Sequence, residues 1–231
     1  MSRKTDIEAL LNRADKTLPK INEEYEKALH AQSISADLRI DIKDYFGNLR
    51  SVLDYLAHDI VEMYCPNANP RDILYFPIRA DQASFDNVMK KSYPDLQTNY
   101  RDIYDVLEEL QPFKKPENVW LTHFNKLNNE NKHERLVAQK RTETKRVNVQ
   151  IKDGGGVSWD PSAVKFGSGV FIGGVPVNPH TQMPNPSNTQ TVTIETWVDF
   201  QFDDINVSAI WLTRESLKQI QTIYSHLKDK I

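Results

Sequence analysis

The glycines of this chain are distributed very unevenly. Seven of the eight lie between Gly154 and Gly174, and residues 1–150 contain only Gly47. Glycine destabilises helix interiors and is favoured in turns and bulges. We therefore expect an α+β fold. An N-terminal helical bundle occupies residues 1–146. A small antiparallel β-sheet and a closing C-terminal helix occupy residues 147–231 and pack with the bundle as one unit.

Apolar residues recur at helical spacing along two long segments before residue 65. Pro19 is expected to kink or split the first segment, because proline cannot continue a regular helix. The second segment ends where Pro66 and Pro70 forbid continuation. A further helix begins near Pro116, and residues 128–131 predict a turn or a helix cap. Five leucine or phenylalanine side chains on these and the closing helix are expected in the core: Leu49, Leu53, Leu56, Phe124 and Leu217.

The spacing changes to period two from Val147 onward, which is typical of strands. Gly173-Gly174 lies between two short apolar runs and predicts a hairpin. Residues 191–202 predict a long strand and residues 207–212 another. Thr213 is expected to cap the closing helix.

Composition excludes several classes of protein. The chain is 39% hydrophobic and 26% charged, with a formal net charge of −3, as in ordinary globular domains. No apolar run is long enough to span a membrane, and the start lacks the apolar core of a signal peptide. The single cysteine, Cys65, rules out an intrachain disulfide. We therefore expect a cytoplasmic protein with no membrane partner. We also predict no cofactor and no resident metal, because no phosphate-binding loop, dinucleotide fingerprint or zinc ribbon is present.

The first candidate site is formed by Arg50, Asp54 and His58, each about one helical turn after the one before. They run along the edge of the apolar face of their helix, where a polar group is half-desolvated. Asp54 can bond either neighbour one turn away. One interpretation is a boundary salt bridge beside a satisfied histidine. The other is an acid–base or metal-binding group that faces another helix.

The second candidate site lies at Asn131, Lys132 and His133, whose side chains are suited to binding an anion or a phosphate. Residues 132–146 contain six Lys or Arg against two Glu, a net charge of +4. Within this run we assign a binding role to Arg135, Lys140 and Arg141. Such a run can mark contact with RNA, but it is more often a solvated helix face.

Four short motifs give a resemblance. They are the run from Asn48 to Ala57 that contains Arg50 and Asp54, then Phe76-Pro77-Ile78, then Leu110-Gln111-Pro112-Phe113, and then Asn131-Lys132-His133. In this order they resemble a group of uncharacterised bacterial proteins with "LRSALDHL", "FPI", "LQPY" and "DKH" elements. The group brings no activity with it.

The arginine-containing helix of that group is also similar to the HEPN superfamily of helical bundles. The superfamily includes metal-independent ribonucleases, toxins and defence proteins, and also inactive binding modules. The resemblance implies an Arg followed one or two turns later by a His. In this chain Tyr55 stands where the group carries the first His, and His58 follows two turns after Arg50.

Three functions remain open at this point. The favoured one is a non-catalytic helical module that binds a partner protein or a small ligand, either as a monomer or as a dimer. The second is a HEPN-like ribonuclease in which Arg50 stabilises the phosphate and His58 or His133 transfers protons, with Asp54 beside them. The third is a metal-dependent helical-bundle enzyme that uses His58, His123, His133 and a carboxylate.

Overall fold

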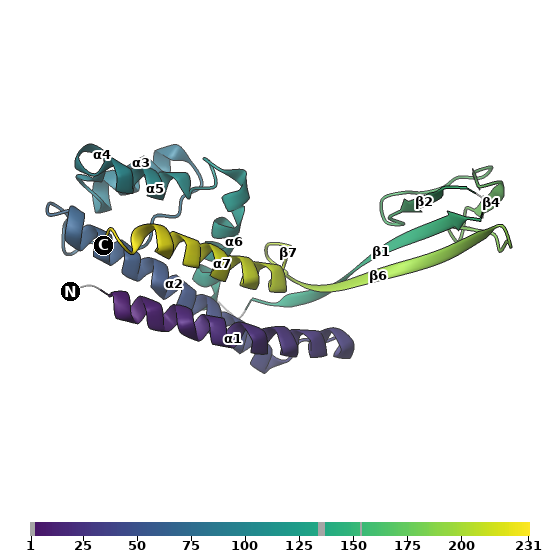
Figure 1. Cartoon of the computed structure of the whole chain (residues 1–231), viewed down its shortest axis with the longest axis horizontal. Helices are drawn as coiled ribbons and strands as arrows, with labels where there is room; N and C mark the ends of the chain where they lie inside the picture. The colour runs from purple at the N-terminus through teal and green to yellow at the C-terminus, as the bar shows by residue number, and fades with distance from the viewer. Residues whose placement is uncertain (1–2, 134–136, 153) are drawn as a thin grey trace. The chain divides into compact units, whose positions relative to one another are not determined.

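The fold is α+β, as the glycine distribution predicts (Figure 1). The computed structural model describes residues 3–133, 137–152 and 154–231, with the backbone alone for residues 131–133. This part of the chain forms two compact units. The helical unit comprises Met1–Lys140 and Phe200–Ile231, and the strand unit comprises Arg141–Asp199. No described helix is both long and apolar enough to cross a membrane.

The helical unit is built on two long helices, α1 (Lys4–Ala31) and α2 (Ala36–Tyr64), which pack against each other and against α7 (Ala209–Leu227). The remaining helices are shorter: α3 (Gln82–Ser92), α4 (Leu96–Asn99), α5 (Arg101–Glu109), the 3-10 helix η1 (Pro116–Asn118) and α6 (Val119–His133). Figure 1 shows α1 in purple and α7 in yellow beside α2. Helix α6 contacts both α2 and α7, so the first and last thirds of the chain share one core.

That core has α2 at its centre. The five side chains expected to be buried are at most 4% exposed: Leu49, Leu53, Leu56, Phe124 and Leu217. Phe46 of α2 contacts Phe124 of α6 and Phe202 at ring-centroid distances of 5.7 and 6.0 Å. The prediction of the apolar helix faces is therefore confirmed.

The strand unit contains parts of two small sheets. Strands β2 (Gly156–Trp159), β1 (Gln139–Ile151), β6 (Gln190–Phe202) and β7 (Val207–Ser208) are neighbours in that order. The second sheet has the order β3 (Phe171–Ile172), β4 (Val175–Asn178) and β5 (Met183–Pro184). Gly173 and Gly174 form the expected hairpin turn between β3 and β4, with φ values of 55° and 78°. A separate small core contains Val147, Val149, Trp159, Ile172 and Val177.

The two units do not divide at residue 146, where the sequence analysis placed the boundary. Residues 139–146 belong to β1, and the boundary between the units falls within β1 and β6. Helix α7 belongs to the helical unit, because its buried residues, among them Leu217 and Ile220, pack in the same core as α1 and α2.

The structure departs from three local predictions. Helix α1 does not split at Pro19 but continues through it, and Pro19 lies on the exposed face. The turn expected at residues 128–131 is absent, since α6 continues to His133 and the Asn128 side chain donates to the Phe124 carbonyl (2.9 Å). Helix α7 begins at Ala209, with Ser208 as its cap, and Thr213 is buried inside it.

We predict that Leu53→Ala lowers the free energy of unfolding by about 2–5 kcal/mol, through lost burial and the cavity left behind. Leu53 is fully buried in α2, whereas Ile40 on the same helix is 43% exposed. Ile40→Ala is the matched control and should cost well under about 1 kcal/mol. Urea unfolding of the two variants measures the difference. Equal losses would contradict the assigned helix face.

We also predict that the helical unit folds without the strand unit. Joining Thr142 to Asp199 through an Asn-Gly turn removes most of the strand unit, and these two residues already face each other, with Thr142 Oγ1 3.2 Å from the Asp199 carbonyl oxygen. A chain that ends at residue 146 should not fold, because it lacks α7. Thermal unfolding followed by circular dichroism compares them. A cooperative transition only in the chain that ends at residue 146 would contradict the assignment of α7 to the helical unit.

Candidate functional site

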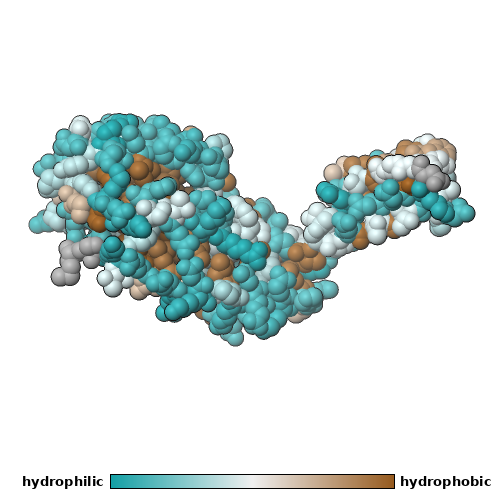
Figure 2. Space-filling model, in the orientation of Figure 1, coloured by the Kyte–Doolittle hydropathy of each residue, from teal (hydrophilic) through white to brown (hydrophobic). Residues whose placement is uncertain are grey.

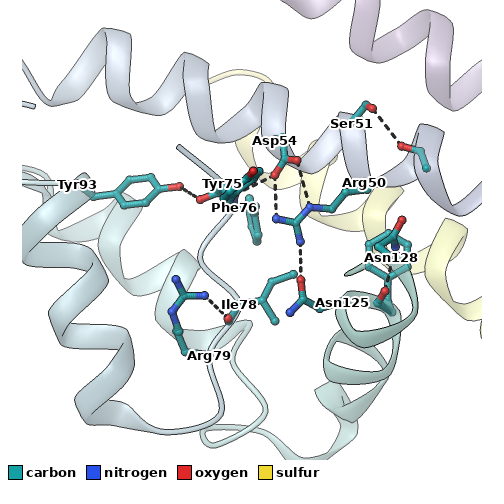
Figure 3. Close-up of polar contacts among 12 residues, drawn as sticks. Arg50, Ser51, Asp54, Tyr75, Phe76, Ile78, Arg79, Tyr93, Asn125 and Asn128 are labelled. Atoms are coloured by element: carbon teal, nitrogen blue, oxygen red, sulfur yellow. Dashed lines mark hydrogen bonds and ion pairs between the residues drawn. The ribbon is translucent and has the colours of Figure 1, made fainter. Parts of the chain in front are cut away.

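Arg50 and Asp54 form an ion pair at the edge of the helical core. Arg50 is only 6% exposed. Its Nε lies 3.1 Å from Asp54 Oδ2, and its Nη2 lies 3.0 Å from Asp54 Oδ1. Its Nη1 donates to Asn125 Oδ1 of α6 at 2.8 Å. The ring of Tyr75 lies 5.7 Å from the guanidinium carbon. All three nitrogens of this guanidinium are therefore engaged (Figure 3).

The same carboxylate also holds the segment that follows α2. Asp54 Oδ1 accepts from the Phe76 N–H at 3.0 Å. Gln111 then fixes the next residues of this segment: its Nε2 donates to the Pro77 carbonyl (2.7 Å), and its Oε1 accepts from the Arg79 N–H (2.9 Å). Gln111 is completely buried.

Three of the four motifs from the sequence analysis thus meet in one place. Hydrogen bonds join the helix that carries Arg50 and Asp54 to Phe76 and to Asn125 of α6 (Figure 3). Gln111 is joined to the same Phe76-Pro77-Ile78 segment through the Pro77 carbonyl. We call this group the Arg50 clamp. Its bonds satisfy backbone groups of a segment without regular secondary structure, which is a structural role.

His58, the third member of the predicted stripe, is separate from the clamp. Both oxygens of Asp54 are occupied by Arg50 and Phe76, and the imidazole of His58 has no hydrogen bond among the described residues. His58 instead lines a cavity of about 320 Å³. We call it the His58 cavity. Its other walls come from the end of α2, the segment after it and the end of α3: Val61, Glu62, Cys65, Ala68, Asn69, Pro70, Asp72, Leu74 and Ser92.

The two carboxylates that line the His58 cavity are Glu62 and Asp72. Arg3 bonds Glu62 (2.5 Å), which lowers the pKa of that carboxyl group. Asn69 Nδ2 donates to Asp72 Oδ1 at 3.1 Å. Burial, and secondarily Asp95, raises the pKa of the Cys65 thiol to about 12. The thiol therefore stays protonated near neutral pH and is a poor nucleophile.

Sequence reasoning missed most of this cavity. His58, Glu62 and Cys65 follow one another at intervals of four and three residues, which places them on one helix face. That spacing was the available signal. The contribution of Asp72 and Ser92 could not be read from the sequence, because the fold of the segment after α2 brings them to the helix.

The second candidate site lies mostly outside the described side chains. Asn131, Lys132 and His133 are described by their backbone in α6, and Arg135 lies outside the described residues. Lys140 and Arg141 are in β1 and are paired: Lys140 Nζ with Asp203 (3.1 Å) and Asn206 (2.8 Å), and Arg141 with Glu143. The helix face considered for this basic run is wrong from residue 139 onward, since those residues form a strand.

His123, proposed as a metal ligand, is half-buried in α6. Burial, and secondarily the charge of Lys126, lowers the pKa of its imidazole. Among the described residues, no three His, Cys, Asp or Glu side chains lie close enough together to hold a metal ion.

Comparisons with protein-family models, with curated proteins and with solved structures give no match to this chain. The local geometry therefore carries the functional argument.

We predict that Asp54→Ala lowers the free energy of unfolding by about 3–5 kcal/mol, because it leaves the buried Arg50 charge unpaired. The matched control is Asp105→Ala, which breaks the exposed pair between Arg101 and Asp105, also one helical turn apart. That change should cost less than about 1 kcal/mol. Urea unfolding of both variants tests the role of the clamp. Similar small losses would show that the clamp contributes little.

Proposed function

We propose that this chain is a non-catalytic binding protein and that its helical unit holds a small ligand in the His58 cavity. The observation that carries the proposal is the cavity itself. It combines a volume of about 320 Å³, within the range of small-molecule sites, with a histidine whose imidazole has no hydrogen bond among the described residues.

The chemistry of the neighbouring groups supports binding over catalysis. A phosphate-stabilising Arg50 would need a free face, but its three nitrogens bond to Asp54 and Asn125. A nucleophilic Cys65 would need a lowered pKa, and burial raises it instead.

The walls of the cavity favour a ligand with an apolar body and a positive end. Val61, Ala68 and Leu74 supply apolar surface, and Glu62 and Asp72 supply negative charge. The Glu62 charge is already balanced by Arg3, whereas Asp72 bonds the neutral side chain of Asn69. A primary ammonium group beside Asp72, with His58 as a hydrogen-bond acceptor, suits this arrangement.

The HEPN-like ribonuclease is the competing hypothesis, and RNA remains a candidate partner under it. That hypothesis requires His58 and His133 to serve one phosphate, together with a guanidinium released from the clamp. Its distinguishing result is cleavage of single-stranded RNA without metal ions.

We predict that benzylamine binds this site and that benzyl alcohol, its uncharged analogue, binds more weakly. Asp72→Asn should raise the dissociation constant for benzylamine by roughly tenfold, because it removes the facing charge. His58→Ala should weaken both compounds. His180→Ala, on the strand unit and outside the cavity, is the control. Titrations followed by backbone NMR shifts measure binding.

Two results would overturn the proposal. One is benzylamine binding that is unchanged in both His58→Ala and Asp72→Asn. The other is metal-free cleavage of single-stranded RNA by the purified protein that His58→Ala abolishes while the variant stays folded.

A further inference from the structure

Strand β6 has one edge that is almost entirely unpaired. It is 13 residues long and pairs along one edge with β1. Along the other edge it pairs with β7, through Gln201 and Phe202 only. Within the described residues, positions 191–199 have no strand neighbour on that side.

The direction of the backbone groups on this edge follows from the two ends of β6. The Thr189 carbonyl accepts from Lys152 (2.9 Å), and the Asp203 N–H donates to Ala138 (2.9 Å), so odd-numbered residues face β1 at both ends. The Phe200 N–H instead donates to Tyr25 Oη at 2.8 Å, on the opposite edge. Because successive residues of a strand alternate, even-numbered residues direct both backbone groups to the open edge.

Those residues are Val192, Ile194, Thr196 and Val198. Positions 191–197 are all exposed, with Ile194 at 53% and Trp197 at 47%. Figure 2 shows apolar patches on the visible face of the strand unit.

Strands β1 and β6 differ in how they protect their outer edges. Strand β1 carries Lys140, Arg141, Lys145 and Arg146, and charged side chains discourage pairing with another chain. Strand β6 contains no Lys, Arg, Pro or Gly, and most of its residues are Thr, Val, Ile, Trp or Phe. These residue types favour strand pairing.

We propose that the open edge of β6 pairs with the same edge of a second copy of this chain, antiparallel and centred on Ile194. Such contacts are closed by a two-fold axis, so two copies satisfy each other without forming a longer assembly. This inference concerns a different surface from the His58 cavity and goes beyond the proposed function.

The register follows from charge and length. The midpoint of the open edge is residue 195, but a two-fold axis there would place Glu195 against Glu195 of the second copy. An axis at residue 196 would pair Val192 with Phe200, whose N–H already bonds Tyr25. An axis at Ile194 opposes Glu195 with Thr193, and it pairs positions 191–197 throughout. Ile194 then lies opposite Ile194 of the second copy. Its N–H and C=O groups point to the open edge, as a hydrogen-bonded pair requires.

Cysteine crosslinking tests the register. In the proposed pairing the two Cα atoms of residue 194 lie about 5.5 Å apart, which a disulfide can bridge. Ile194→Cys should therefore form a covalent dimer under mild oxidation. Val192→Cys is the matched control on the same strand face. Its two copies are offset by four residues, roughly 13 Å along the strand, and should not crosslink. The native Cys65 is buried in both variants.

Sedimentation of the full chain provides the second test. The unmodified chain should sediment as a dimer. Ile194→Lys should raise the dimer dissociation constant by on the order of tenfold or more, because it places two like charges opposite each other. Phe171→Lys, a 62% exposed position elsewhere in the strand unit, should leave the dimer unchanged. A monomer at all concentrations, open-ended aggregation, or equal crosslinking of the two cysteine variants would overturn the proposal. None of these results bears on benzylamine binding.

Discussion

The helical unit depends on keeping one buried guanidinium neutralised. Arg50 is 6% exposed on α2, and a charge this deeply buried requires an opposite charge and full hydrogen bonding. Asp54 supplies the charge one turn away, and Asn125 of α6 accepts from the remaining nitrogen of the guanidinium. The second task of Asp54, holding the Phe76 N–H, then ties an irregular segment to α2. One ion pair thus links a helix, a loop and a second helix.

This structural use of Arg50 determines where chemistry is available. Each nitrogen of this guanidinium already bonds within the protein, so a phosphate would compete with Asp54 and Asn125 for it. His58, two turns further along α2, lies instead in a cavity whose other polar side chains are two carboxylates, an asparagine, a serine and a cysteine. The physical contrast on one helix is between a charge satisfied by the protein and a histidine that faces open volume. It is the basis for proposing a binding function.

The strand unit presents a different constraint, which arises from backbone hydrogen bonding. Where β1 and β6 pair only with each other, they leave two edges of unpaired N–H and C=O groups. Charged side chains protect the β1 edge, while the β6 edge is uncharged except for Glu195 and Asp199. The position of Glu195 near the middle of that edge selects among the registers in which two copies can pair.

The sequence alone determined the α+β class, the buried helix faces and the hairpin at Gly173-Gly174, because periodicity and glycine geometry are local properties. It also identified the interaction of Arg50 with Asp54, one turn apart on a helix. Only the tertiary structure decided that α1 continues through Pro19, that α7 joins the helical core, and that residues after α2 line one cavity with His58. Packing and solvent exposure decide these features, and they depend on contacts between segments that no local pattern records.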